Sequence, residues 1–331
     1  MTLHIDVCNG DADGLCAVVQ WRLHEPVAAR MITGLKREIE LLAQVEAVPR
    51  VQVLVCDLSM QRNRQALLKL LAGGVFVRYF DHHHVDQIPA HPLLEAHIDL
   101  GGDTCTSLLM DRYLKGRFRA WALVGAFGDN LSGVAERLGA ALGLPFEDRR
   151  RLQALGEAIN YNAYGDTVED VYIAPALLYE RLAKYADPLE FLNQESIGQA
   201  LDARRNDDLQ RARSSPPYMQ SANVRVYLLP DAPWARRVMG SLGNDLAHAD
   251  PLRAHAVLKA RASGGFTVSV RAPLGRPGGA AAFCQQFGGD GRAAAAGIDH
   301  LPEDQLDRFI VSLSAYSWGE TPLALPGVPH D

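Results

Sequence analysis

Three predicted strands of this chain are each followed by acidic or imidazole side chains, and no other feature constrains its fold as strongly. The strands are the short apolar runs at residues 3–8, 51–58 and 75–80, and helix-like segments at 14–24 and 61–74 lie between them. Continuous apolar strands between amphipathic helices predict a parallel sheet that is covered on both faces. In such a sheet the carboxyl ends of the strands share one edge, and ligands bind beyond that edge.

The side chains at this predicted edge have the chemistry of metal ligands. The first strand leads into NGDADG with Asp11 and Asp13, the second ends at Asp57, and the third runs into DHHH at residues 81–84. Carboxylates that lie close together repel each other unless a cation lies between them. Carboxylate and imidazole ligands suit Mn²⁺, Fe²⁺, Zn²⁺ or Co²⁺ better than Ca²⁺, and two such ions can activate water and hold a phosphoryl group. The pattern predicts a metal site, although each piece alone would also suit an acidic turn or a helix N-cap.

A break in the pattern divides the chain. Residues 103–185 are mostly helix-like, 195–213 form a polar helix, and SSPPY at 214–218 interrupts it. Further strands are predicted at 224–230, 254–262 and 265–273, the last two as a hairpin, and further helices at 233–248, 279–287 and 303–315. We predict an α/β fold with an N-terminal parallel-sheet domain at 1–190, a helical linker at 191–222 and a smaller C-terminal α/β domain at 223–331.

Charge and cysteine content disfavour several kinds of partner. A net charge of −6 over 331 residues gives no overall basic field, so long-duplex nucleic acid is not an expected partner. The five cysteines form no CxxC pair, which disfavours a disulfide framework or a thiolate zinc site. The N-terminal stretch lacks the features of a signal peptide, and no apolar run approaches the roughly 20 residues of a membrane span. We expect a cytoplasmic protein with no membrane partner.

Four ordered motifs give the chain a resemblance to a known superfamily. They are NGDADG (9–14), VLVCD (53–57), FDHH (80–83) and LVGAFGDN (123–130), with GGDTCTSLL (101–109) before the last of them. In order and spacing they resemble the DHH phosphoesterase superfamily, which includes RecJ-like exonucleases and nanoRNA and cyclic-dinucleotide phosphodiesterases and is related to family II pyrophosphatases. In the second half, VSVRAP and GGDGRAAAAGI resemble the C-terminal substrate-binding domain of that superfamily.

The resemblance implies a site for two metal ions, usually manganese, with magnesium, cobalt or iron as alternatives. The implied ligands of the first ion are Asp11 and Asp57. The implied ligands of the second ion are Asp13, Asp57, His82 and Asp129. Asp57 would therefore bridge the two ions.

The resemblance also implies roles in catalysis. Asp57 and His83 are the implied catalytic residues: Asp57 holds the ions that activate a water molecule, and His83 faces the phosphate and assists the leaving group. The metal-activated water would attack phosphorus in line with the leaving group. Asp81 and His84 would lie behind the ligands and help to position them, without binding an ion themselves.

The chain departs from the superfamily pattern just before its first acids. A histidine is usual at that point, whereas this chain carries Asn9. Asparagine can bind a metal through its amide oxygen, but more weakly than imidazole does. The first ion would then be loosely held, supplied with the substrate or absent. Asp6 and Cys8 are alternative ligands, although Asp6 would point to the opposite face of a regular strand from the next residue.

A second departure lies near the C-terminus, where the usual GGGH is replaced by GGDGR. Gly288, Gly289 and Gly291 would let backbone N–H groups approach a phosphate, which Arg292 would grip through two hydrogen bonds. Arg271 matches the substrate-binding arginine of the superfamily. The alternative interpretation of this segment is an ordinary loop between two helices.

These features predict an enzyme, a manganese-dependent phosphoesterase. Its predicted substrate is a phosphodiester of a short oligonucleotide, a dinucleotide or a related small phosphorylated molecule. A nuclease acting on long DNA is disfavoured because the chain is acidic and only 7% aromatic. The alternatives are a pyrophosphatase or polyphosphatase, and a catalytically weak nucleotide-binding module, which Asn9 favours. The resemblance is compatible with a homodimer, for which the sequence itself carries no signal.

Overall fold

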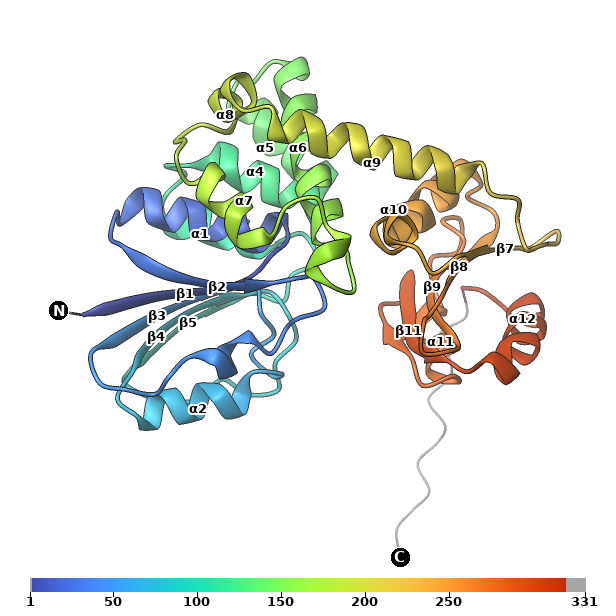
Figure 1. The fold of residues 1–331 in the computed structure, drawn as a ribbon, viewed down its shortest axis with the longest axis horizontal. Helices are drawn as coiled ribbons and strands as arrows, with labels where there is room; N and C mark the ends of the chain where they lie inside the picture. Colours follow the sequence, from blue (N-terminus) through green and yellow to red (C-terminus); the bar gives the residue numbers. More distant parts are fainter. Residues whose placement is uncertain (1, 320–331) are drawn as a thin grey trace, which may run out of the picture. The chain divides into compact units, whose positions relative to one another are not determined.

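The chain divides into two units, residues 1–205 and 206–331, and the computed structural model describes residues 2–319 (Figure 1). The division falls within the helix α9 (Ile197–Arg213), inside the stretch predicted to be a linker. The predicted C-terminal domain extends to residue 331, and its part from residue 320 onward lies outside the described residues. The predicted domain limits at 190 and 223 stay predictions.

The first unit contains a five-stranded sheet in which every strand runs parallel to its neighbours, which confirms the predicted parallel sheet. Its order is β2-β1-β3-β4-β5. The strands are β1 (Leu3–Asn9), β2 (Ala29–Gly34), β3 (Val51–Cys56), β4 (Phe76–Asp81) and β5 (Leu94–Ile98). The sequence-based prediction missed β2 and β5. Both are edge strands that are only partly buried and mix polar with apolar residues, so neither forms a continuous apolar run.

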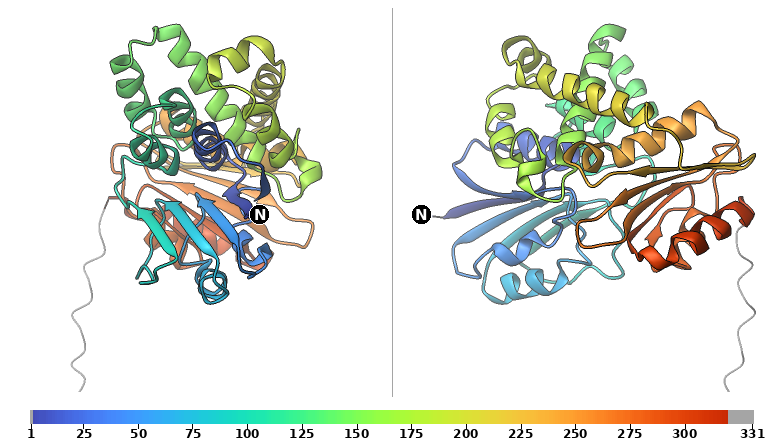
Figure 2. Two further views of the ribbon diagram at one scale, coloured as in Figure 1. Left: turned by 90° about the vertical axis from the view of Figure 1, so that its left-hand side faces the viewer. Right: turned by 45° about the vertical axis from the view of Figure 1, so that its right-hand side comes forward.

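Helices cover both faces of this sheet (Figures 1 and 2). On one face α1 (Ala12–His24) and α4 (Arg119–Gly128) join a large apolar core. On the other face lie α2 (Arg64–Ala72) and the 3₁₀ helix η1 (Leu41–Gln44). The other helices of this unit are α3 (Thr106–Tyr113), α5 (Ser132–Ala141), α6 (Phe146–Ala163), η2 (Val168–Asp170), α7 (Pro175–Leu182) and α8 (Pro188–Gln194). Burial on both sides explains why the central strands are mostly apolar.

The second unit is a smaller α/β structure around a six-stranded sheet of order β10-β11-β9-β8-β7-β6. Its strands are β6 (Met219–Gln220), β7 (Val224–Leu229), β8 (Ala254–Ala260), β9 (Phe266–Arg271), β10 (Asp290–Gly291) and β11 (Ala295–Leu301). The antiparallel pairing of β8 with β9 confirms the predicted hairpin. Helix α10 (Pro233–Ala249) covers one face, and α11 (Ala280–Gln285), η3 (Glu303–Gln305) and α12 (Leu306–Ala315) lie on the other.

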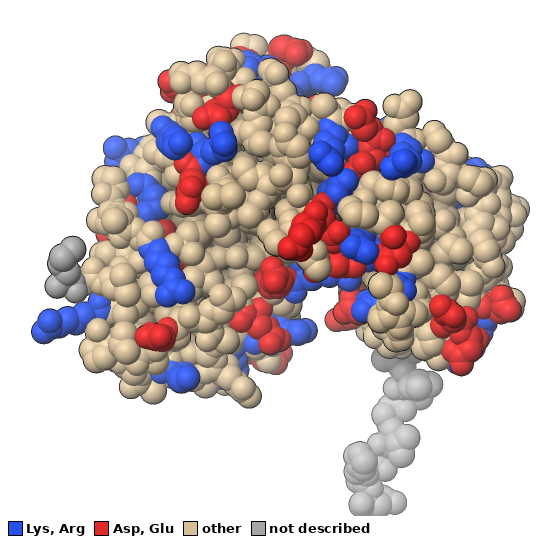
Figure 3. Space-filling view, in the orientation of Figure 1, with Lys and Arg blue, Asp and Glu red and all other residues tan. Residues whose placement is uncertain are grey.

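Positively and negatively charged side chains are interspersed on the face shown in Figure 3. Within neither unit do lysine and arginine form a continuous track on this face, in keeping with the net charge of −6. Within residues 2–319, no helix combines the length and the apolar character needed to cross a membrane.

Candidate metal centre

The carboxyl ends of β1, β3 and β4 bring the predicted ligands to one edge of the sheet. The strand order changes direction at β1, and in sheets of this order ligands bind at such a point. Asp11 follows β1 as the N-cap of α1, and its Oδ1 accepts the N–H of Gly14 at 3.0 Å. Asp57 follows β3 with φ at 57°, in the left-handed region that aspartate tolerates better than most residues. Backbone strain of this kind is concentrated at functional sites.

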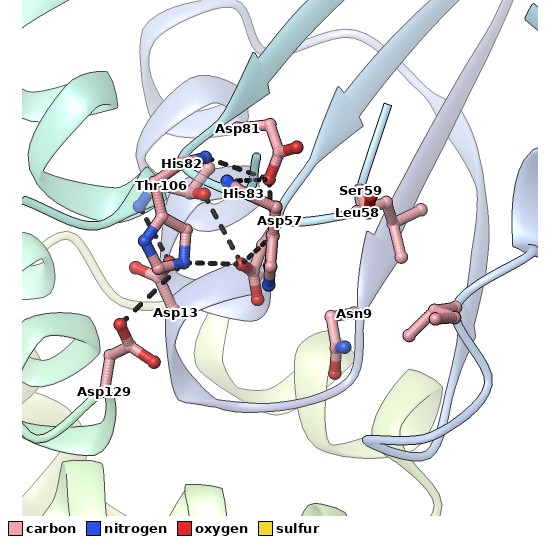
Figure 4. Close-up of polar contacts among 12 residues, drawn as sticks. Asn9, Asp13, Asp57, Leu58, Ser59, Asp81, His82, His83, Thr106 and Asp129 are labelled. Atoms are coloured by element: carbon pink, nitrogen blue, oxygen red, sulfur yellow. Dashed lines mark hydrogen bonds and ion pairs between the residues drawn. The ribbon is translucent and has the colours of Figure 1, made fainter. Parts of the chain in front are cut away.

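Four side chains converge here in what we call the carboxylate–histidine cluster, formed by Asp13, Asp57, His82 and Asp129 (Figure 4). The Nε2 atom of His82 lies 3.4 Å from Asp57 Oδ1, 3.8 Å from Asp129 Oδ2 and 3.9 Å from Asp13 Oδ2. Ligand atoms about 2.1 Å from one octahedral ion lie about 3 Å apart, so small movements would let these atoms share an ion. The side chain of Asp129 is 22% exposed, and the other three are more deeply buried.

Two backbone N–H groups orient the carboxylate of Asp13. The N–H of Thr106 donates to its Oδ2 and the N–H of Ser107 to its Oδ1, both at 2.7 Å. These groups begin α3, where helical N–H groups have no partner within the helix and favour negative charge. The hydroxyl of Thr106 also donates to Asp57 at 3.5 Å. Neither Thr106 nor Ser107 was predicted as a site residue, although both belong to the GGDTCTSLL segment that resembles the superfamily.

Asp129 reaches the cluster from α4, of which it is the C-cap residue. Helix α4 packs tightly against its neighbours at Gly125 and Gly128. A Cβ atom at Gly125 would collide with the hydroxyl of Ser107, and one at Gly128 would collide with Ala12. The glycines of LVGAFGDN therefore let α4 approach α1 and α3 closely enough to bring Asp129 beside Asp13.

The cluster is electrostatically unfavourable without a cation. Burial, together with repulsion from Asp11 and Asp13, raises the pKa of Asp57 well above its usual range. Burial and the charge of Asp13 raise the pKa of Asp129 to about 6. Two overlapping groups, Asp13–His82–Asp129 and Asp57–His82–His83, each hold three ligand atoms within 4.8 Å of one another. The donor set of carboxylate oxygens with imidazole nitrogen therefore fits a divalent metal ion, which would favour the ionised carboxylates.

Asp81 positions His83 beside the cluster. Its fully buried carboxylate accepts the backbone N–H groups of His82, His83 and Met60 at 2.9, 3.2 and 3.3 Å. The Nδ1 atom of His83 lies 2.7 Å from the same carboxylate. Burial lowers the pKa of His83, but the bond to Asp81 outweighs it and raises the pKa overall. With Nδ1 engaged by Asp81, Nε2 is the ring nitrogen left for a substrate.

Lys36, which the sequence analysis did not single out, lies just after β2 at the same edge. Its ammonium group forms an ion pair with Asp11 Oδ2, and we call these two residues the Asp11–Lys36 pair. Burial opposes both charges, but their attraction lowers the pKa of Asp11 and raises that of Lys36 well above its ordinary value. The amide of Asn9 is directed at the backbone: its Oδ1 accepts the N–H of Asp11 at 3.3 Å, and its Nδ2 donates to the carbonyl of Lys36 at 3.4 Å.

Three other residues considered in the sequence analysis lie in surroundings that differ from those of the cluster. Asp6 forms two hydrogen bonds with Arg22, at 2.7 and 2.6 Å. Cys8 is fully buried, and burial raises the pKa of its thiol well above the ordinary value, so the thiolate that binds metals is disfavoured. The side chain of His84 is 77% exposed and contacts Asp86 at 3.1 Å.

The predicted substrate residues all belong to the second unit. Arg271 ends β9, and its guanidinium donates to Asn244 Oδ1 at 2.7 Å and to Ser269 Oγ at 2.8 Å. The other predicted residues share the segment around β10, which is a short strand pair with β11 rather than a loop between two helices: Gly288, Gly289, Gly291 and Arg292. Their part in substrate binding stays a prediction.

Comparisons with known proteins bear on the fold. No protein-family model matches the chain, and no curated protein sequence is significantly similar to it. Solved structures do match. A DHH domain described as a member of a family of ribosomal proteins aligns with a TM-score of 0.63 and 15% identity, over 95% of this chain and 86% of that one.

Two further matches are enzymes by their descriptions. Exonuclease RecJ bound to manganese aligns with a TM-score of 0.59 and 19% identity, over 95% of this chain and 89% of that one. The pGpG-specific phosphodiesterase PggH from Vibrio cholerae aligns with a TM-score of 0.55 and 13% identity, over 95% of this chain and 98% of that one. At such identities the likeness concerns the fold. The chain has a DHH-superfamily fold, which confirms the resemblance at that level.

Proposed function

We propose that this chain is a metal-dependent phosphoesterase that hydrolyses a phosphodiester bond in a short oligonucleotide, a dinucleotide or a related small phosphorylated molecule. The observation that carries the proposal is the carboxylate–histidine cluster, where three acids and an imidazole converge although the acids repel one another without a cation. Manganese is the proposed ion. RecJ, which shares the fold at 19% identity, was solved with manganese bound, and this supports the choice.

Each residue of the centre has a proposed task. The cluster would hold the ion, which when bound lowers the pKa of water and polarises a phosphoryl oxygen. Asp13 keeps its orientation through the backbone N–H groups of Thr106 and Ser107. The raised pKa of His83 keeps its ring protonated nearer to neutral pH, so Nε2 can donate a proton to the leaving oxygen. Asp81 holds that ring in place.

A short substrate suits the charge distribution better than a long strand. A protein that tracks along single-stranded nucleic acid needs a continuous basic groove with stacking aromatic side chains. On the face in Figure 3 the basic side chains are interspersed with acidic ones. One protein of the same fold is a pGpG-specific phosphodiesterase, which supports a substrate of that size.

The test is hydrolysis of a substrate panel in the presence of Mn²⁺. The panel contains bis-p-nitrophenyl phosphate, pApA, a cyclic dinucleotide, a short RNA and pyrophosphate. We expect turnover of at least one diester by the wild type and its loss in Asp57→Ala and His83→Ala. Hydrolysis of pyrophosphate alone would show an anhydride hydrolase instead. Metal binding without turnover of any substrate would contradict the proposal and favour a nucleotide-binding module.

A further inference from the structure

The resemblance assigns two acids, Asp11 and Asp57, to a first metal ion, but Asp11 is not available to bind a metal. Asp11 has both oxygens engaged: Oδ2 pairs with the Lys36 ammonium, and Oδ1 accepts the N–H of Gly14 at 3.0 Å. Among residues 2–319, one of the two groups with metal-binding geometry includes Asp57, and neither includes Asp11. The residues present therefore fit an ion at the carboxylate–histidine cluster and do not fit a second ion at Asp11.

Lys36 is held in this position by its backbone as well as by its charge. Its N–H donates to the carbonyl of Ala163 at 3.0 Å, and its own carbonyl accepts a hydrogen bond from Asn9. The preceding N–H, of Leu35, donates to Glu38 at 2.7 Å. The Lys36 side chain is 27% exposed, and its partner Asp11 is 1% exposed. Lys36 is thus anchored at the site and is not a loose surface lysine.

Asn9 contributes to this arrangement in a way that a metal-binding histidine would not. A side-chain amide carries an acceptor oxygen and a donor nitrogen on the same carbon atom. Asn9 uses the first for the N–H of Asp11 and the second for the carbonyl of Lys36. The residue that departs from the superfamily pattern is therefore the residue that joins the two members of the Asp11–Lys36 pair.

We propose that the ammonium group of Lys36 takes the place of the first of two metal ions, so that the site binds one divalent cation, at the carboxylate–histidine cluster. This inference rests on the proposed function, which supplies the metal at that cluster. When ionised, Asp11, Asp13, Asp57 and Asp129 carry four negative charges, which one ammonium and one divalent ion largely neutralise. A second divalent ion at Asp11 would have to displace Lys36 or lie beside its charge, and repulsion between cations is strong at a buried site.

Metal content of the full-length protein tests this inference. Elemental analysis after gel filtration and titration calorimetry would count Mn²⁺ ions per chain, and electron paramagnetic resonance would distinguish isolated Mn²⁺ from a spin-coupled pair. We expect one Mn²⁺ per wild-type chain and the spectrum of an isolated ion. Two ions of similar affinity, or a coupled spectrum, would overturn the inference by showing that metal displaces Lys36. Absence of Mn²⁺ binding would overturn it as well.

Variants identify the residue that excludes a second ion. The double variant Asn9→His/Lys36→Met should bind two Mn²⁺ ions per chain and give a coupled spectrum, whereas Lys36→Arg should keep one. Lys69→Met is the matched control, because Lys69 is an exposed lysine on α2 and the charge change is the same. Circular dichroism would check that each variant is folded. If the folded double variant still binds a single ion, Lys36 is not what excludes the second one.

The count of ions does not depend on turnover, so the two proposals can fail separately. One Mn²⁺ per wild-type chain without hydrolysis of the substrate panel would support the role of Lys36 and contradict the proposed phosphoesterase. Two ions per chain with hydrolysis of a diester would support the phosphoesterase and contradict the role of Lys36.

Discussion

The carboxylate–histidine cluster and the Asp11–Lys36 pair lie at the same edge of one sheet, but the pKa values of their acids are shifted in opposite directions. In the pair, an ammonium group from the chain lowers the pKa of Asp11. In the cluster, burial and mutual repulsion raise the pKa of Asp57 well above its usual range and that of Asp129 to about 6. A buried acid with a cation from the chain is part of the fold, whereas buried acids without one mark a place for a ligand.

This difference explains which acids are available to a metal. Asp6, on β1, also pairs with a cation from the chain, Arg22, although burial outweighs that pairing and raises its pKa overall. A position at a strand end brings an acid to the site. Whether a cation of the chain lies beside it then determines whether the acid forms an ion pair or is available to a metal.

Asp57→Asn should have the largest effect on the proposed activity. A metal ion stabilises the transition state by several kcal/mol, so turnover with Mn²⁺ should fall about a thousandfold or more. The metal-free variant should nevertheless unfold at higher urea concentration than the metal-free wild type, because it loses a repelled, buried charge and asparagine accepts the left-handed backbone. Retention of turnover within tenfold would remove Asp57 from the centre.

Asp11→Asn should lower the stability of the metal-free protein, whereas Asp57→Asn should raise it. It leaves the ammonium of Lys36 without its partner, and breaking a buried ion pair costs about 3 kcal/mol. Urea unfolding of the metal-free protein measures this loss, and Asn is a matched replacement at both Asp11 and Asp57. If both substitutions stabilise the metal-free fold, the two regions do not differ in the way described.

The next largest effect should be a pH dependence of stability that arises from the acids of the cluster. The carboxyl of Asp129 titrates near pH 6 in the folded chain, against about 4 when unfolded. Folding therefore takes up a proton between these values, and metal-free stability should rise as pH falls from 7 to about 4.5, by at most about 3 kcal/mol from this group. Saturating Mn²⁺ should reverse the trend, because the ionised carboxylate is the ligand.

Urea unfolding at pH 5 and pH 7, with and without Mn²⁺, would measure this dependence. Asp129→Asn is the control, since it should reduce the gain in stability on acidification. Asp11, whose pKa is lowered, contributes in the other direction, with stability lost as pH falls below its ordinary pKa. Metal-free stability that falls steadily from pH 7 to pH 5 would contradict the description of the cluster.

Asp81→Asn should have the smallest effect, because Asp81 acts through His83. We expect turnover to fall about 10- to 100-fold, as is usual when a residue that orients an active-site side chain is removed. The number of Mn²⁺ ions bound should not change, and the pKa that His83 contributes to the pH profile of turnover should fall. A loss of bound metal would instead assign Asp81 to the metal centre.

Much of the fold and the chemistry of the site could be predicted from local sequence. β1, β3 and β4 are mostly apolar because helices cover both faces of the sheet. The carboxyl ends of parallel strands meet at one edge, so the acids and histidines after these strands had to converge. The edge strand β2 was missed because partial burial leaves it without an apolar run, and without β2 nothing placed Lys36 at the site.

The sequence by itself determined which kinds of side chain gather at the edge of the sheet, since strand type and strand end follow from local pattern. Only the tertiary structure decided how each of them is used. The N–H of Thr106 reaches Asp13 across 93 residues of chain, and Lys36 reaches Asp11 across 25. Contacts over such separations depend on how helices and edge strands pack, and Coulomb interactions depend on the resulting distances. Local sequence does not specify those distances.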